Sequence, residues 1–117
     1  MTSTSKPPYW LRLGDLRLAL VSDGALRVDG GSMFGVVPKA LWQRLVTPDE
    51  RNRIPLAANC LLVDAPGGLV LVDVGLGRKL SPKMREIFCV SETPTLLSSL
   101  GALGVSPADI TFVVPTH

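Results

Sequence analysis

The residue best suited to chemistry is His117, the only histidine of the chain, which follows a strand-like apolar segment at residues 110–114. Imidazole nitrogens are common zinc ligands, and zinc requires three or four donor atoms at about 2.0–2.3 Å. One histidine cannot supply them, and the sequence contains no other cluster of candidate ligands. His117 is therefore either the first ligand of a larger metal site or an ordinary polar residue.

A second candidate is Asp73, which lies near the end of an apolar strand expected at residues 69–74 and precedes Gly75 and Gly77. Open α/β sheets place their chemistry at the carboxyl ends of their strands, where Asp73 would lie. Aspartate also accepts hydrogen bonds from the turn that follows it, so the carboxylate has a structural use as well. We expect Asp73 and Gly75 to support a neighbouring site and not to react themselves.

The glycines after Asp73 do not form a phosphate-binding loop. A dinucleotide fingerprint needs a third glycine where Leu80 stands, and a P-loop needs four residues between its first glycine and Gly-Lys-Ser/Thr. A nucleotide-binding α/β module remains a third hypothesis, which protection by NAD or ATP in a thermal-shift assay would support.

Length and composition indicate one small globular domain. The 117 residues are 46% hydrophobic and 19% charged with a formal net charge of +2, a balance that does not indicate a nucleic-acid or anionic-membrane surface. We expect a flexible leader at residues 1–8, a domain at residues 9–117 and a small molecule as the partner. Because neither a secretory signal nor an apolar run near the ~20 residues of a membrane span is present, the expected compartment is the cytoplasm. The oligomeric state cannot be read from the sequence.

Two cysteines, Cys60 and Cys89, lie in apolar surroundings and lack the spacing of a metal knuckle or a redox pair. We expect both to be buried thiols that pack as small hydrophobic residues. A disulfide between them is left open.

Five segments are rich in apolar residues, several of them alternating with polar ones, and predict β-strands. They cover residues 10–13, 16–21, 56–63, 69–74 and 110–114. A tight turn joins the first two strands, and a second turn is expected at residues 22–24. A helix at residues 93–104, with Thr93 as its cap and Pro94 in its first turn, connects the last two strands, which should therefore be parallel.

The glycine-rich segment at residues 28–38 predicts a loop that exposes Met33 and Phe34, and residues 39–46 fit two turns of helix. Together the elements predict an α/β fold with a mixed β-sheet and helix cover. The strand at residues 110–114 needs cover from residues that the sequence does not contain, so the fold is expected to be incomplete. Expressed alone, the chain should bind a hydrophobic dye or aggregate.

Taken together, these segments resemble the N-terminal half of metallo-β-lactamase-fold hydrolases. The family's strand pair ending in Asp-Thr-Gly is similar to residues 59–63 with 69–77, which end in Asp73-Val74-Gly75. The helix, turn and strand before the family's metal motif resemble residues 98–114, and Thr116-His117 matches the opening of Thr-His-x-His-x-Asp-His. Residues 30–42 with 49–54 resemble the entrance segment of a subgroup with lactonase-like members. Val74 in place of threonine and Pro115 in place of an aliphatic residue depart from the family pattern.

The resemblance implies part of an αββα sandwich that binds one or two metal ions, usually zinc, with other divalent metals as alternatives. It makes His117 the first histidine ligand and Asp73 a buried aspartate near the site that is not a ligand. Met33, Phe34 and Trp42 would lie at the substrate mouth. The remaining ligands and the second half of the sandwich would lie beyond His117, which makes the chain a fragment that is inactive by itself.

The leading hypothesis is the N-terminal part of a metal-dependent hydrolase of esters, lactones, thioesters or amides. In the complete protein, metal ions would polarise a carbonyl or phosphoryl oxygen and lower the pKa of a bound water to near neutrality. His117 would bind through one ring nitrogen while a neighbour orients the other. The alternative is a catalytically inert truncated product, or a piece that pairs with a complementary chain.

Overall fold

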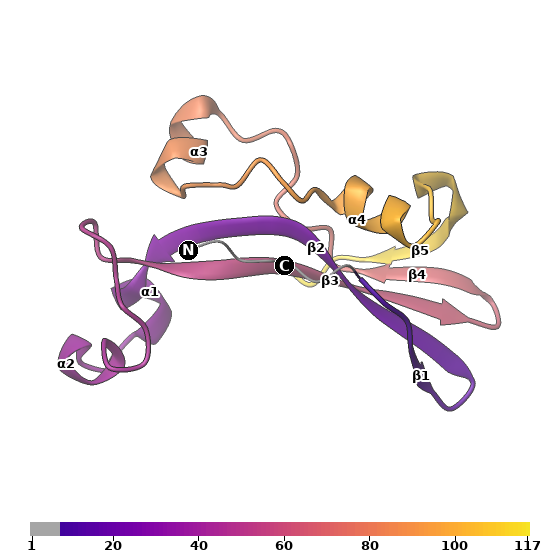
Figure 1. Cartoon of the computed structure of the whole chain (residues 1–117), viewed down its shortest axis with the longest axis horizontal. Helices are drawn as coiled ribbons and strands as arrows, with labels where there is room; N and C mark the ends of the chain where they lie inside the picture. The colour runs from indigo at the N-terminus through magenta and orange to yellow at the C-terminus, as the bar shows by residue number, and fades with distance from the viewer. Residues whose placement is uncertain (1–7) are drawn as a thin grey trace.

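The computed structural model describes residues 8–117, which form one five-stranded sheet with helices on one face and at one end (Figure 1). The strands, in sheet order, are β1 (Leu11–Leu13), β2 (Leu16–Asp29), β3 (Arg53–Ala65), β4 (Gly68–Val72) and β5 (Ile110–Val114). The helices are α1 (Gly30–Phe34), α2 (Lys39–Trp42), α3 (Pro82–Ile87) and α4 (Leu96–Ala102), with a 3₁₀ turn at Pro107–Asp109. Apart from Pro8, the expected leader lies outside the described residues.

The sheet is mixed, as the sequence predicts. The β1–β2, β2–β3 and β3–β4 pairs are antiparallel, and β4–β5 is parallel. The parallel pair confirms the strand–helix–strand interpretation, because a crossover through α4 returns the chain in the same direction. None of the helices in residues 8–117 has the length and apolar character that crossing a bilayer demands.

The turn expected at residues 22–24 is wrong. β2 continues to Asp29, and a β-bulge between Ser22 and Ala25 absorbs the irregular residues. Gly24 has a φ of 102°, a value that L side chains rarely adopt, and its N–H donates to the Ser22 hydroxyl at 3.0 Å. The Ser-Asp-Gly signal therefore marks a kink within one long strand.

The loop expected at residues 28–38 is in part a short helix. Asp29 caps α1, because its Oδ1 accepts hydrogen bonds from the N–H groups of Gly31 at 2.7 Å and Ser32 at 3.3 Å. Gly30 packs directly against the Trp42 ring, which would overlap any Cβ at this position. The glycines here serve close packing as well as a turn.

Two helix boundaries also differ from expectation. α2 ends at Trp42, so the helix expected at residues 39–46 is one turn long. α4 begins at Leu96, with Thr95 as its cap, because the Thr95 hydroxyl accepts from the Ser98 N–H at 3.0 Å and the Ser98 hydroxyl reaches back to the Thr95 N–H at 2.9 Å. The cap is therefore Thr95 and not Thr93.

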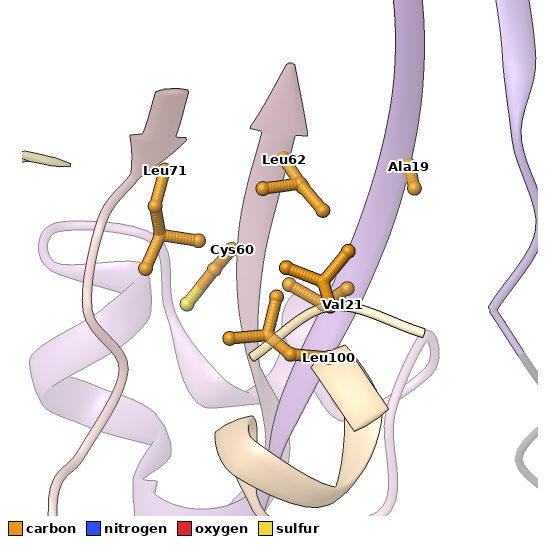
Figure 2. Close-up of a cluster of buried hydrophobic side chains, with 7 residues drawn as sticks. Ala19, Val21, Cys60, Leu62, Leu71 and Leu100 are labelled. Atoms are coloured by element: carbon orange, nitrogen blue, oxygen red, sulfur yellow. The ribbon is translucent and has the colours of Figure 1, made fainter. Parts of the chain in front are cut away.

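The core lies between α4 and the face of the sheet that it covers (Figure 2). Leu100 from α4 packs against side chains of three neighbouring strands. The buried cluster comprises Ala19, Val21, Cys60, Leu62, Leu71, Leu100 and Val105. Strand alternation sends these residues to the helix side and leaves the intervening residues on the opposite face.

The opposite face of the sheet is apolar and exposed. Leu20 is 60% exposed, and on β5 the corresponding values are 56% for Phe112 and 48% for Val114. No strand beyond β5 pairs with it within residues 8–117. The sheet thus carries apolar side chains on both faces, as its sequence predicts, and one of these faces lacks a cover in the described part of the chain.

This exposed face should bind a hydrophobic dye. The 117-residue polypeptide is expected to enhance the fluorescence of anilinonaphthalene sulfonate, because contiguous exposed apolar patches bind apolar ligands. The double substitution Phe112→Thr with Val114→Thr removes part of this patch and should reduce the enhancement at least about twofold. Val36→Thr, which changes a fully exposed valine near α1, is the matched control and should have little effect. A monomer that melts cooperatively without binding dye would contradict this prediction.

Candidate functional site

The candidate site lies where β4 and β5 end at the same edge of the sheet. Val72 pairs with Val114, and the Asp73 N–H donates to the Val114 carbonyl oxygen at 2.8 Å. Because the two strands are parallel, the loop after β4 and the segment after β5 start side by side. The structure thus brings Asp73 close to the segment that carries His117.

Asp73 adopts a φ of 72°, which is uncommon for a residue with a side chain. Its Oδ1 accepts a hydrogen bond from the Val74 N–H at 2.9 Å, so the carboxylate stabilises the first peptide of its own loop. The strand expected to reach Val74 ends at Val72, and Asp73 starts the turn.

The carboxylate that holds the glycine loop belongs to Asp23, on β2. Its Oδ2 accepts from the N–H groups of Leu76 at 2.7 Å and Gly77 at 3.0 Å, and its Oδ1 accepts from the Leu96 N–H at 2.7 Å. One side chain therefore ties β2 to the loop after β4 and to the start of α4. This role is not evident from the sequence, because Ser22-Asp23-Gly24 has the composition of a turn and the partners of Asp23 lie 53 to 73 residues away in the chain.

Gly75 lies against this carboxylate. Its φ is 72°, and a Cβ at this position would be 2.5 Å from both the Cβ and the Oδ2 of Asp23. A larger residue would push Asp23 away from the amides that it accepts from. Close approach to Asp23 and a left-handed backbone are thus two separate reasons for glycine here.

His117 is exposed, and its Nδ1 lies 2.7 Å from the Thr116 hydroxyl oxygen. In the tautomer in which Nδ1–H donates to this hydroxyl, the hydrogen bond fixes the ring and Nε2 keeps the lone pair that binds a metal or accepts a proton. The Thr116 hydroxyl is thus the group placed to orient this ring.

The two cysteines differ. Cys60 is 2% exposed in the core, and burial, followed by the charges of Asp73 and Asp23, raises the pKa of its thiol to about 11. Cys89 is exposed, so the expectation that both thiols are buried is wrong for this residue, which follows the last turn of α3 with a φ of 46°. Both cysteines are free.

The residues expected at a substrate mouth lie at the far end of the β2–β3 ribbon (Figure 1). Phe34 stacks on Trp42 with ring centroids 5.0 Å apart and planes 9° from parallel. Trp42 is 2% exposed, whereas Met33 is 50% exposed. Trp42 is thus the buried member of the aromatic pair, whereas Met33 and part of Phe34 are exposed.

These residues do not meet Asp73 within the described fold. Arg53, at the start of β3 beside α1, precedes Leu61 by eight residues, and Leu61 pairs with Val72. At ~3.3 Å per residue this separation is roughly 26 Å. The structure therefore does not bring the aromatic pair and the edge at Asp73 into one pocket.

The residues described here do not complete a metal site. Residues 8–117 contain no group of three His, Cys, Asp or Glu side chains placed to hold one ion, whereas zinc requires three or four donors. His117 supplies one imidazole, and the Asp73 carboxylate is engaged by its own loop. No catalytic step through a metal can be derived from these donors alone.

Comparison with known proteins identifies the fold. The sequence model of the Metallo-beta-lactamase superfamily matches residues 53–117. A probable metal-dependent hydrolase from Staphylococcus aureus aligns over 92% of this chain with 34% identity and a TM-score of 0.84. The chain therefore belongs to the metallo-β-lactamase superfamily and forms part of its fold.

Two further solved structures agree in fold. The dizinc quorum-quenching lactonase AidC, solved with a product, N-hexnoyl-L-homoserine, aligns over 91% of this chain at 29% identity and a TM-score of 0.67. The hydrolase AbOPH aligns over 98% at 20% identity and a TM-score of 0.72, which supports the fold alone. This chain covers 39%, 34% and 37% of the S. aureus, AidC and AbOPH chains respectively. A search of curated proteins gives no significant match.

Proposed function

We propose that this chain is the N-terminal portion of a metal-dependent hydrolase that cleaves an ester, lactone, thioester or amide in a small molecule. The observation that carries the proposal is the parallel β4–β5 pair, in which the Asp73 N–H donates to the Val114 carbonyl at 2.8 Å. This pair directs both the glycine loop and the histidine segment to one sheet edge, in a chain 34% identical to a probable metal-dependent hydrolase.

In this proposal each residue of the edge has a separate task. His117 provides Nε2 as one donor to the metal, and Thr116 holds Nδ1. Asp23 fixes residues 76–77 beneath the site through two backbone hydrogen bonds. Zinc is the proposed metal, since AidC is described as a dizinc enzyme, and the other donors come from outside residues 8–117.

Metal removal tests the proposal on the protein expressed from the full reading frame that contains these codons. The protein should hydrolyse at least one member of a panel of chromogenic esters, thioesters, lactones and amides. Dialysis against a chelator should lower the activity at least about 100-fold, and added zinc should restore it. Hydrolysis that survives complete metal removal, or a fully metallated protein inactive on the whole panel, would contradict the proposal.

A non-catalytic role for the 117-residue polypeptide by itself is favoured by its single imidazole donor. Zinc titration by calorimetry separates the two cases. The isolated polypeptide offers one imidazole donor, whereas structural and catalytic zinc sites use three or four donors. Its dissociation constant for zinc should therefore be above about 1 μM. Micromolar or tighter binding would contradict the inert interpretation.

A further inference from the structure

A cavity lies away from the β4–β5 edge, where the β2–β3 ribbon meets the end of α3. It has a volume of about 330 Å³, at the lower end of the range of small-molecule sites. Three arginines, Arg27, Arg51 and Arg53, line one part of it, and Ile87 and Phe88 contribute apolar surface.

The apolar part is fixed by the same strands that supply Arg27 and Arg53. The Arg27 N–H donates to the Phe88 carbonyl at 2.6 Å, and Arg53 Nη1 donates to the Ile87 carbonyl at 2.9 Å. The segment after α3 is thereby held along the outer edge of β2, where the Ser91 N–H also donates to the Ala25 carbonyl at 2.9 Å. The cavity thus has two walls joined by hydrogen bonds.

The positive charges of this cavity are only partly neutralised. Asp49 Oδ2 lies 2.9 Å from Arg53 Nε but 3.9 Å from Arg27 Nη1, so Arg27 makes the weaker pair. Partial burial raises the pKa of Asp49, but hydrogen bonds from Arg53 and from the Arg51 backbone outweigh it and leave this pKa below its ordinary value. Asp49 is therefore charged at neutral pH, and its carboxylate is already paired with Arg53.

The side chain of Arg51 makes no ion pair or hydrogen bond within residues 8–117. Asp29, which also lines the cavity, caps α1 through its Oδ1. The three guanidinium groups thus exceed the carboxylates of Asp29 and Asp49 by one charge, and Arg27 and Arg51 retain donors for an anion.

We propose that this cavity binds a small organic carboxylate, with its head between Arg27 and Arg51 and its hydrocarbon body against Ile87 and Phe88. Guanidinium groups recognise carboxylates by paired hydrogen bonds, and the adjoining apolar surface selects an amphiphilic anion over a bare one. The site lies at the end of β3 remote from Asp73, so it is independent of the proposed hydrolytic function.

Hexanoate is the probe, with hexan-1-ol and inorganic phosphate as comparison ligands. Binding is followed on the full-reading-frame protein by the ¹H–¹⁵N signals of the arginine Nε groups. Hexanoate should shift the Arg27 and Arg51 signals saturably with a Kd below about 1 mM, and neither comparison ligand should bind within tenfold of it. Hexanol binding of equal strength would show only apolar adsorption and would overturn the proposal, as would equal phosphate binding.

Arg51→Gln is the decisive variant, because Arg51 is exposed and its side chain has no hydrogen bond or ion pair to lose in the described part of the chain. It should weaken hexanoate binding at least about tenfold, and Arg27→Gln should do the same if it folds. Arg44→Gln, an exposed arginine outside the cavity, changes the net charge equally and should alter Kd less than twofold. An Arg51→Gln protein that binds hexanoate like the Arg44→Gln control would overturn the proposal.

Discussion

Replacing Asp23 with alanine is expected to lower the free energy of unfolding by about 3–5 kcal/mol, since hydrogen bonds to charged groups contribute roughly 1.5–3 kcal/mol each and water replaces part of that loss. Asp23 accepts three such bonds from Leu76, Gly77 and Leu96. All three donors are backbone amides, so they cannot turn towards another acceptor without moving the loop or α4. The effect should be measured by urea denaturation of the full-reading-frame protein.

Asp15→Ala provides the matched control, because Asp15 is an exposed carboxylate in the β1–β2 turn. It should change the unfolding free energy by less than about 0.5 kcal/mol. Hydrogen exchange adds a local measurement: the amides of Leu76 and Leu96 should lose protection in Asp23→Ala before the β2–β3 ladder does. If Asp23→Ala and Asp15→Ala unfold at the same urea concentration, Asp23 does not hold the loop.

Replacing His117 with alanine should lower kcat/KM of the same protein at least about 100-fold, because even loss of a group that orients a metal ligand typically reduces metal affinity or activity 10–100-fold. The side chain is exposed, and among residues 8–117 its hydrogen bond is to Thr116, so the substitution should leave the melting temperature of the metal-free protein unchanged. A loss of activity without a loss of fold is the signature of a ligand.

Thr116→Val separates orientation of the ring from donation. It keeps His117 but removes the hydroxyl 2.7 Å from Nδ1, and a loss of about 10-fold or more in zinc affinity is expected. Arg78→Ala is the control, because Arg78 is an exposed cation next to the glycine loop. It should change kcat/KM and zinc affinity less than twofold. Full activity in His117→Ala would exclude this residue as a metal ligand.

The local sequence pattern was sufficient to predict the strands of the sheet and the parallel direction of its last two strands. Residues 69–72 are apolar on both faces and are followed by a helix and a second apolar segment, so a parallel pair follows from general rules of chain connection. The observed β4–β5 pair, with Val72 opposite Val114, confirms it. The same pattern predicts that β5 needs a cover, because every residue of that strand except Thr111 is apolar. No element of the described residues provides this cover, so the strand is exposed.

Local pattern failed where distant partners decide the conformation. Ser22-Asp23-Gly24 has the composition of a turn, but a long antiparallel partner, β3, pairs with β2 on both sides of it and converts it into a bulge. Asp23 gains its role from amides at positions 76, 77 and 96, which no short-range signal could reveal. Trp42 likewise is buried because Gly30 offers no side chain, a fit between two segments that propensity does not describe.

The most direct measurement is a zinc-edge anomalous difference map from crystals of the full-reading-frame protein. The predicted result is a peak at the edge of the sheet beyond β4 and β5, about 2.0–2.1 Å from His117 Nε2, the usual zinc–imidazole distance, with the Thr116 hydroxyl on Nδ1. A peak far from His117, or an imidazole turned away from the loop that begins at Asp73, would contradict the assignment of this chain to the metal centre of a hydrolase.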